Sequence, residues 1–506
     1  MIGTWWSTAP RGTRVLVGLF ALHVVVKAAL FTQVAHVGLT GDQVAYADAA
    51  RALSNLVRDL VGLGPLHVAE LKDNVVGGGW FMPGSSVLMT PLFLVDPHAS
   101  IVAIRLYLAL TSTLLLLVTV LSVRRTLGDL YAGVLIVLPG LIPMWLLFSA
   151  AAWGDLVAGL LATILLMRVI EMVRGLRAGT PPSLGAGVRY GLLAIVLVYA
   201  RSSTVLIVIA TGVVLALGSV LLLRGRDRWR AAGALALAAA AFGAVLAPWS
   251  VFASTTLDAR VITTTTVPLV TANTFGDRDR VCFGPCDPIV NLGQPTGSIW
   301  FPPMQYAREV ARATGRSEVE VQQQMSAYAR TDETVYSYAE DVLGNAGRYF
   351  RAPASYSRFL MPSDSRHGVV HTLVVLLTDA LGGLVLLGGV LAMLAVVRRT
   401  VETQVVSLLV TLSLGALLTQ PFVHLCSARY WTTAAPVAAL GVALLIQMAD
   451  ARRALPRFTA APATMGTPAP GHVPDLTIRK WLVVAQFVLA AGAVLVTAAV
   501  VVLGRT

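Results

Sequence analysis

The chain has 506 residues, of which 56% are hydrophobic and only 13% are charged. This composition excludes an ordinary soluble protein, and the length exceeds what one small core needs. The formal net charge of +12 comes mainly from arginine. The arginines cluster in short loops between apolar runs, which indicates membrane topology, so no nucleic-acid partner is expected. The bias toward Ala, Val, Leu and Arg is typical of a bacterium with a GC-rich genome.

Several apolar runs exceed the ~20 residues that cross a bilayer, and arginine-rich ends alternate with arginine-poor ends. The sequence therefore predicts an all-α polytopic protein of the cell membrane, with about eleven spans and a cytoplasmic N-terminus. The first span ends near Leu39. The other spans are expected near residues 101–123, 130–148, 155–174, 185–200, 204–224, 231–249, 369–398, 400–424, 431–452 and 481–503.

The spacing of the spans divides the chain into five parts. These are a transmembrane module (1–253) whose first outer loop is 40–100, a large extracytoplasmic loop (254–368), further spans (369–450), a cytoplasmic linker (451–479) and a C-terminal span (480–506). The linker is assigned by its Pro, Ala and Thr content.

The first outer loop contains an amphipathic segment. Apolar residues recur at helical spacing from Ala45 to Leu60, with Asp48, Arg51 and Arg58 between them. This pattern predicts a juxtamembrane helix that lies on the membrane surface. The apolar run 80–95 is interrupted by prolines and is interpreted as re-entrant or interfacial.

Cys282 and Cys286 are three residues apart in the large outer loop. Without further Cys or His at zinc spacing, this is a weak metal pattern. In an oxidising compartment the two cysteines could form a small disulfide loop.

Asp42 and Asp155 are placed at the outer ends of two helices that are distant in sequence. A charge at membrane depth costs free energy, so each carboxylate is expected to have a structural or functional role there. Together they could divide the roles of general base and of acceptor or metal positioning. The structural alternatives are a helix-end loop residue for Asp42 and an N-cap for Asp155.

Arg201 and Arg429 are also placed at the outer face. The planar donors of two guanidinium groups suit a phosphate, which they bind bidentately. The alternative for both is that the side chains extend to the outer lipid headgroups. A carboxylate pair beside an arginine pair is what transfer from a lipid phosphate requires.

A series of short motifs occurs in a specific order over residues 14–449. They are Lys27 in the first span, Asp42 and Tyr46, Arg105-Leu106, Arg124-Arg125 with Gly128, Asp155, Pro248-Trp249, the threonines 263–266, Asn273, and Arg429-Tyr430 with Pro436. In this order the chain resembles the GT-C superfamily of membrane glycosyltransferases, near the branch of protein O-mannosyltransferases and the lipid A aminoarabinose transferase.

The resemblance implies an inverting hexosyl or pentosyl transfer from a polyprenyl-phosphate sugar on the extracytoplasmic face, with Asp42 as general base. The acceptor stays open among lipids, glycans and proteins. The family often has Asp-Glu where this chain has Asp42-Gln43, which leaves open whether Asp42 and Asp155 hold a divalent metal. Lys72 only loosely replaces a family lysine that precedes a double proline and is assigned to the donor phosphate.

Two other functions compete with this hypothesis. One is a polysaccharide ligase or polymerase that uses a polyprenyl-diphosphate donor, although such proteins need no acid at the position of Asp42. The other is a lipid or solute transporter, which would more often show an internal repeat, and none is visible. The absence of a phosphate-binding G-x-x-x-x-G-K-[ST] loop disfavours a nucleotide-driven pump.

Overall fold

The computed structural model describes residues 10–277, 301–349, 353–362, 368–393, 401–424, 426 and 428–453. Within these residues every regular element is a helix and there is no strand. Eight helices are long and apolar enough to cross a membrane, and two apolar helices are shorter. The prediction of an all-α polytopic membrane protein is confirmed. The expected linker beyond residue 453, the last span, Cys282 and Cys286 lie outside the described residues.

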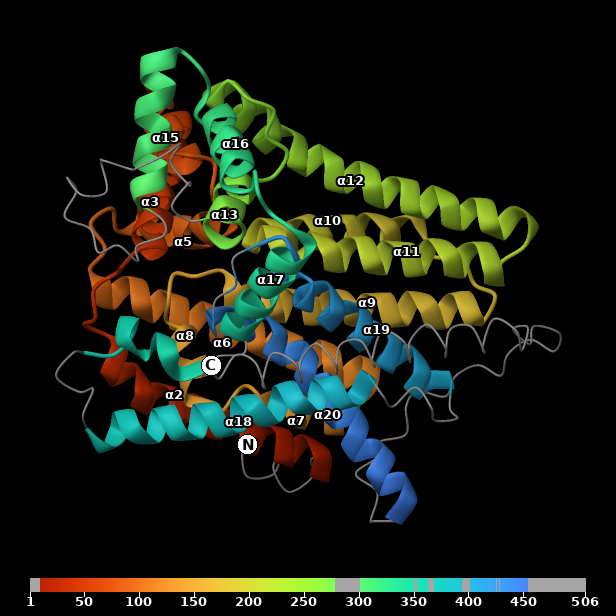
Figure 1. Cartoon of the computed structure of the whole chain (residues 1–506). Helices are drawn as coiled ribbons and strands as arrows, with labels where there is room; N and C mark the ends of the chain where they lie inside the picture. The colour runs from red at the N-terminus through yellow and green to blue at the C-terminus, as the bar shows by residue number, and fades with distance from the viewer. Residues whose placement is uncertain are drawn as a thin grey trace.

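The long helices run side by side and form the body of the molecule (Figure 1). They are α2 (Arg11–Val34), α6 (Ile101–Leu127), α9 (Asp155–Arg177), α10 (Leu184–Ala200), α11 (Val205–Leu222), α12 (Gly225–Leu257), α18 (Val369–Met393), α19 (Val401–Leu418) and α20 (Trp431–Arg453). Helix α9 is the central one: 83% of its apolar window is buried, and it packs against α6, α10, α11 and α20. The first residue of α9 is Asp155.

The prediction of a single span over residues 130–148 is wrong. The structure has two helices there, α7 (Asp129–Val137) and α8 (Pro143–Phe148). Pro139 and Pro143 cannot donate a backbone hydrogen bond, so the helix is interrupted between them. Helix α8 is wholly buried and leads into the turn that precedes α9.

The first outer loop folds into α3 (Asp42–Gly62), α4 (Val68–Leu71), the π-helix η1 (Lys72–Val76) and α5 (Gly84–Val95). The amphipathic helix is confirmed and begins at Asp42. Its alanines, Ala47 and Ala50, are buried in one cluster with Met89 and Phe93 of α5. Removal of these apolar surfaces from water fixes the start of α3 against the membrane module.

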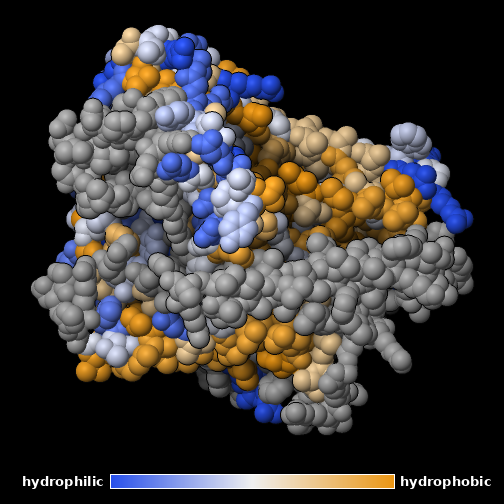
Figure 2. Space-filling model, in the orientation of Figure 1, coloured by the Kyte–Doolittle hydropathy of each residue, from blue (hydrophilic) through white to orange (hydrophobic). Residues whose placement is uncertain are grey.

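The described part of the large outer loop contains four further helices and a short 3₁₀ segment. These are α13 (Thr266–Thr274), α15 (Phe301–Thr314), α16 (Glu318–Ala329), α17 (Val335–Tyr349) and η4 (Pro353–Phe359). Helices α15 and α16 lie at the same end of the molecule as α3 and α5 (Figure 1). Hydrophilic side chains gather at this end, whereas hydrophobic ones cover the flanks of the long helices (Figure 2). The short helices η7 (Gln420–Phe422) and η8 (Ala428–Tyr430) connect α19 to α20.

Candidate active site

One cavity of about 410 Å³ brings together the four charged residues singled out at the outer helix ends. Asp42 begins α3, Asp155 begins α9, Arg201 follows α10, and Arg429 lies in η8. The cavity is lined by Thr40, Gly41, Asp42, Ala45, Tyr46, Trp80, Phe81, Met82, Trp153, Gly154, Asp155, Ala200, Arg201, Ser202, Ser203, Thr266, Tyr356, Phe359, His424, Arg429 and Tyr430.

The four charged side chains form a continuous ion-pair network. Arg429 Nη1 lies 2.8 Å from Asp42 Oδ2, and Arg429 Nε lies 3.6 Å from Asp155 Oδ2. The other oxygen of Asp155 pairs with Arg201 Nη1. Arg429 therefore bridges the two carboxylates, and Asp155 bridges the two guanidinium groups.

The two carboxylates differ in their surroundings. The side chain of Asp155 is 2% exposed and faces both arginines, whereas that of Asp42 is 33% exposed and pairs with Arg429. The N-cap residue of α9 is Gly154 and Asp155 is the first residue inside the helix, so Asp155 is not the N-cap that the structural alternative required. Asp42 is the carboxylate that an incoming molecule can reach, and Asp155 is the one that orders the arginines.

Local backbone features bring these residues into place. Gly41 has φ of +55°, a value favourable for glycine, and it turns the chain into α3 so that Asp42 occupies the first turn. A carboxylate there is stabilised by the helix dipole. A Cβ on Gly154 would lie 2.2 Å from the carbonyl oxygen of Ala200. Only glycine allows this approach, which sets Asp155 beside Arg201.

Aromatic rings surround the arginines. The Cζ atom of Arg201 lies 3.7 Å from the ring centre of Tyr430, and that of Arg429 lies 5.5 Å from the Trp153 ring. Such cation–π contacts keep the planar groups oriented. Burial opposes the charge on Arg429, but Asp42 together with Tyr430, Tyr356 and Tyr46 favours it, and the pKa of Arg429 is raised above its usual value. Arg429 therefore stays a cation.

Comparison with known proteins gives structural neighbours only, since no protein-family model and no curated protein matches the chain. The chain is similar to the archaeal oligosaccharyltransferase AglB from Archaeoglobus fulgidus, in complex with an inhibitory peptide and a dolichol-phosphate (11% identity, TM-score 0.44). The match covers 94% of this chain but only 55% of AglB, so the chain spans about half the length of that protein.

It is also similar to ArnT from Cupriavidus metallidurans. For the apo state the identity is 16% and the TM-score 0.34, with 88% of this chain and 80% of ArnT covered. For the form bound to undecaprenyl phosphate the identity is 17% and the TM-score 0.35, with 86% and 79% covered.

Lys72 is not among the residues that line the cavity. It begins η1 and is exposed, while the same short helix buries Val76. Its assignment to a donor phosphate remains a prediction that this geometry does not support.

Two buried side chains hold together the backbone segments that carry Asp42 and Asp155. Neither of them is assigned to the site from the sequence. Arg105 is 0% exposed and donates to the carbonyl oxygens of Val37 (2.7 Å), Gly38 (3.0 Å) and Ala150 (3.1 Å). Gln43 is also buried, and its Oε1 accepts from the backbone of Ala152 at 3.2 Å. These bonds join the chain on both sides of Asp42 to the turn that precedes Asp155.

The side chains that line the cavity do not fit a resident divalent metal. The two carboxylates face guanidinium groups, and the described residues contain no group of three His, Cys, Asp or Glu that could hold a metal ion. A metal at Asp42 would first have to displace the cation Arg429.

Proposed function

We propose that the chain is a membrane glycosyltransferase that moves a sugar from a polyprenyl-phosphate carrier to an acceptor hydroxyl. The single observation that carries this proposal is the cavity in which a partly exposed carboxylate meets two guanidinium groups ordered by a second carboxylate. The guanidinium groups suit the donor phosphate. The accessible carboxylate suits the acceptor, and the apolar helices around it suit the lipid tail.

The transfer proceeds in one displacement. The acceptor oxygen attacks the anomeric carbon from the side opposite the phosphate, and its proton passes to Asp42. The bond between the anomeric carbon and the phosphate oxygen breaks, which releases polyprenyl monophosphate and inverts the anomeric centre. Negative charge grows on the leaving phosphate, where Arg201 and Arg429 stabilise it more strongly than in the ground state.

The bridging position of Arg429 links donor binding to the base. In the pairing seen here Arg429 Nη1 lies against Asp42 Oδ2, so the guanidinium occupies the carboxylate that the acceptor must reach. A donor phosphate competes for the same guanidinium, so its arrival releases Asp42 for the acceptor. Asp155 keeps Arg429 in place during this exchange.

We further propose that the cavity opens on the extracytoplasmic face. The cavity lies at the N-terminal end of α9, whose last turn, far from it, carries Arg174 and Arg177, and α6 likewise ends with Arg124 and Arg125. Arginine-rich ends face the cytoplasm. The acceptor can then be a lipid, glycan or protein of the cell envelope, and the sugar a hexose or pentose.

Sidedness is tested with two matched single-cysteine variants in a background without the native cysteines. Thr314→Cys, at the end of α15, is expected to react with a membrane-impermeant thiol reagent in intact cells. Thr180→Cys, between α9 and α10, is expected to react only after the membrane is opened. Labelling of Thr180→Cys but not of Thr314→Cys in intact cells would reverse the orientation.

Ligand-dependent stability of the purified protein separates the proposal from its alternatives. A polyprenyl monophosphate at a hundredfold excess over its Kd should stabilise the wild type by about 2.7 kcal/mol. Stabilisation by polyprenyl diphosphate alone would instead favour the ligase or polymerase, and stabilisation by a solute without lipid would favour a transporter. Absence of any shift with the monophosphate contradicts the proposal.

A further inference from the structure

Helix α17 of the large outer loop reaches the turn between α19 and α20 through Asn345. This side chain is 2% exposed. Its Nδ2 donates to the carbonyl oxygens of Pro421 at 2.9 Å and His424 at 2.6 Å, and its Oδ1 accepts from the backbone of Cys426 at 2.7 Å. One amide thus satisfies three backbone groups of a turn that is distant in the sequence.

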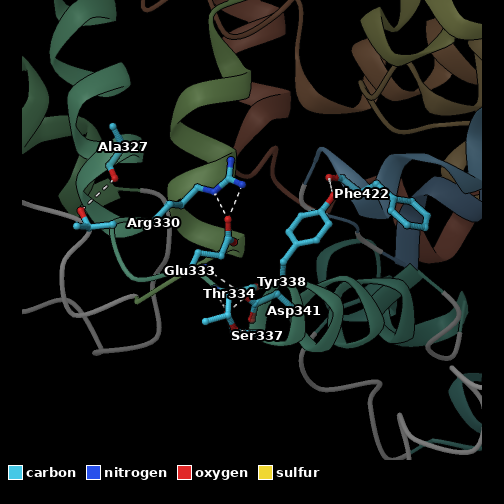
Figure 3. Close-up of polar contacts among 10 residues, drawn as sticks. Ala327, Arg330, Glu333, Thr334, Ser337, Tyr338, Asp341 and Phe422 are labelled. Atoms are coloured by element: carbon cyan, nitrogen blue, oxygen red, sulfur yellow. Dashed lines mark hydrogen bonds and ion pairs between the residues drawn. The ribbon is translucent and has the colours of Figure 1, made fainter.

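Tyr338 supports the same contact from two helical turns earlier in α17. Its hydroxyl donates to the carbonyl oxygen of Phe422 at 2.7 Å (Figure 3). The start of α17 is fixed in turn by Thr334 and Ser337, and Asp341 accepts from the backbone of Gly276 at 2.9 Å. Helix α17 is therefore anchored on one side to the segment that follows α13, and on the other side to the turn 420–424 and to Cys426.

This turn leads directly into η8, which carries Arg429. On the other side of η8, Thr432 Oγ1 donates to the carbonyl oxygen of Arg429 at 2.7 Å. The backbone of Arg429 is thus held by α20 after it, and the turn 420–424 that Asn345 holds precedes it in the chain. His424, which Asn345 contacts, also lines the cavity.

We propose that Asn345 is a positioning residue for donor recognition, which acts through the turn 420–424 on Arg429; this rests on the phosphate role proposed above. Asparagine is the residue type required, because it supplies two donors and one acceptor at one point. Aspartate would set a charge against two carbonyl oxygens, and alanine would remove all three hydrogen bonds at once.

A double-mutant cycle on polyprenyl monophosphate affinity tests this role. Asn345→Ala is expected to weaken binding about tenfold in the wild-type background. In the Arg429→Ala background the same change is expected to have almost no further effect, because the group that it positions is gone. Wild-type affinity in Asn345→Ala, or a full tenfold loss in both backgrounds, would overturn the inference.

Two further variants complete the test. Thr334→Ala removes a cap at the start of the same helix without touching the turn, so it is expected to keep wild-type affinity; an equal loss would mean general loosening of α17. If Asn345→Ala does not fold, the cycle is carried out with Tyr338→Phe instead. This variant is expected to lose about threefold in monophosphate affinity, and the loss should disappear in the Arg429→Ala background.

The cycle also distinguishes the two proposals. Unchanged affinity in Arg429→Ala itself would remove the phosphate site and the proposed function with it. Weak binding by Arg429→Ala together with normal binding by Asn345→Ala would leave the phosphate site standing and remove only the positioning role.

Discussion

Asp42→Asn is expected to lower sugar transfer by about 10²–10⁴-fold, the usual effect of removing a positioned general base. Asparagine has nearly the shape of aspartate but cannot take the acceptor proton. Polyprenyl monophosphate affinity should stay at or above the wild-type value, because Arg429 is no longer held by a carboxylate at this position. The measurement is turnover and monophosphate affinity at matched expression.

Asp48→Asn is the matched control. It lies on the same helix and has an arginine partner too, since Asp48 Oδ1 is 2.6 Å from Arg51 Nη1, but it does not line the cavity. Its turnover should equal that of the wild type. Near-normal turnover by Asp42→Asn would mean that Asp42 is only the first residue of a helix. Asp155→Asn should instead weaken donor binding, because it disorders both arginines.

Arg429→Ala is expected to weaken polyprenyl monophosphate binding by about 2–3 kcal/mol, or roughly 30- to 150-fold. The change removes one of the two guanidinium groups proposed to bind the phosphate. It also leaves Asp155, which is buried, with one guanidinium instead of two. Arg429→Lys should recover part of this affinity, since it keeps the charge but not the planar fork. Binding is measured by titration of the purified protein.

Arg330→Ala controls for loss of an arginine ion pair as such. Arg330 pairs with Glu333 in the outer loop, away from the cavity (Figure 3). Its affinity for the monophosphate should be unchanged. Equal binding by Arg429→Ala and the wild type would contradict the phosphate assignment.

The sequence was sufficient to predict most of the long helices and to select the four charged residues that meet in the cavity. Apolar length and arginine-rich ends located the spans, and helical spacing located α3. Asp42, Asp155, Arg201 and Arg429 could be selected because they are the charges predicted at the otherwise arginine-poor outer ends of the helices, where charge near membrane depth is costly. Their common position at one face followed from the alternation of helix directions.

The contacts that hold the site could not be predicted in this way. Arg105 and Asn345 act on backbone groups that are 45 to 81 positions away along the chain. Neither has a local pattern that reveals its partner. Gln43 was seen only as a departure from a family motif, whereas in the structure it bonds to the turn before Asp155. The division into α7 and α8 did have a local signal in Pro139 and Pro143.

The central claim is that this cavity transfers a sugar from a polyprenyl phosphate. The most direct measurement uses membranes that contain the wild type or Asp42→Asn and a polyprenyl-phosphate sugar labelled in both parts. The wild type is expected to release polyprenyl monophosphate and to label an acceptor in equal amounts. Asp42→Asn is expected to lose both the release and the labelling. Release of no monophosphate by the wild type, or equal release by both proteins, would contradict the central claim.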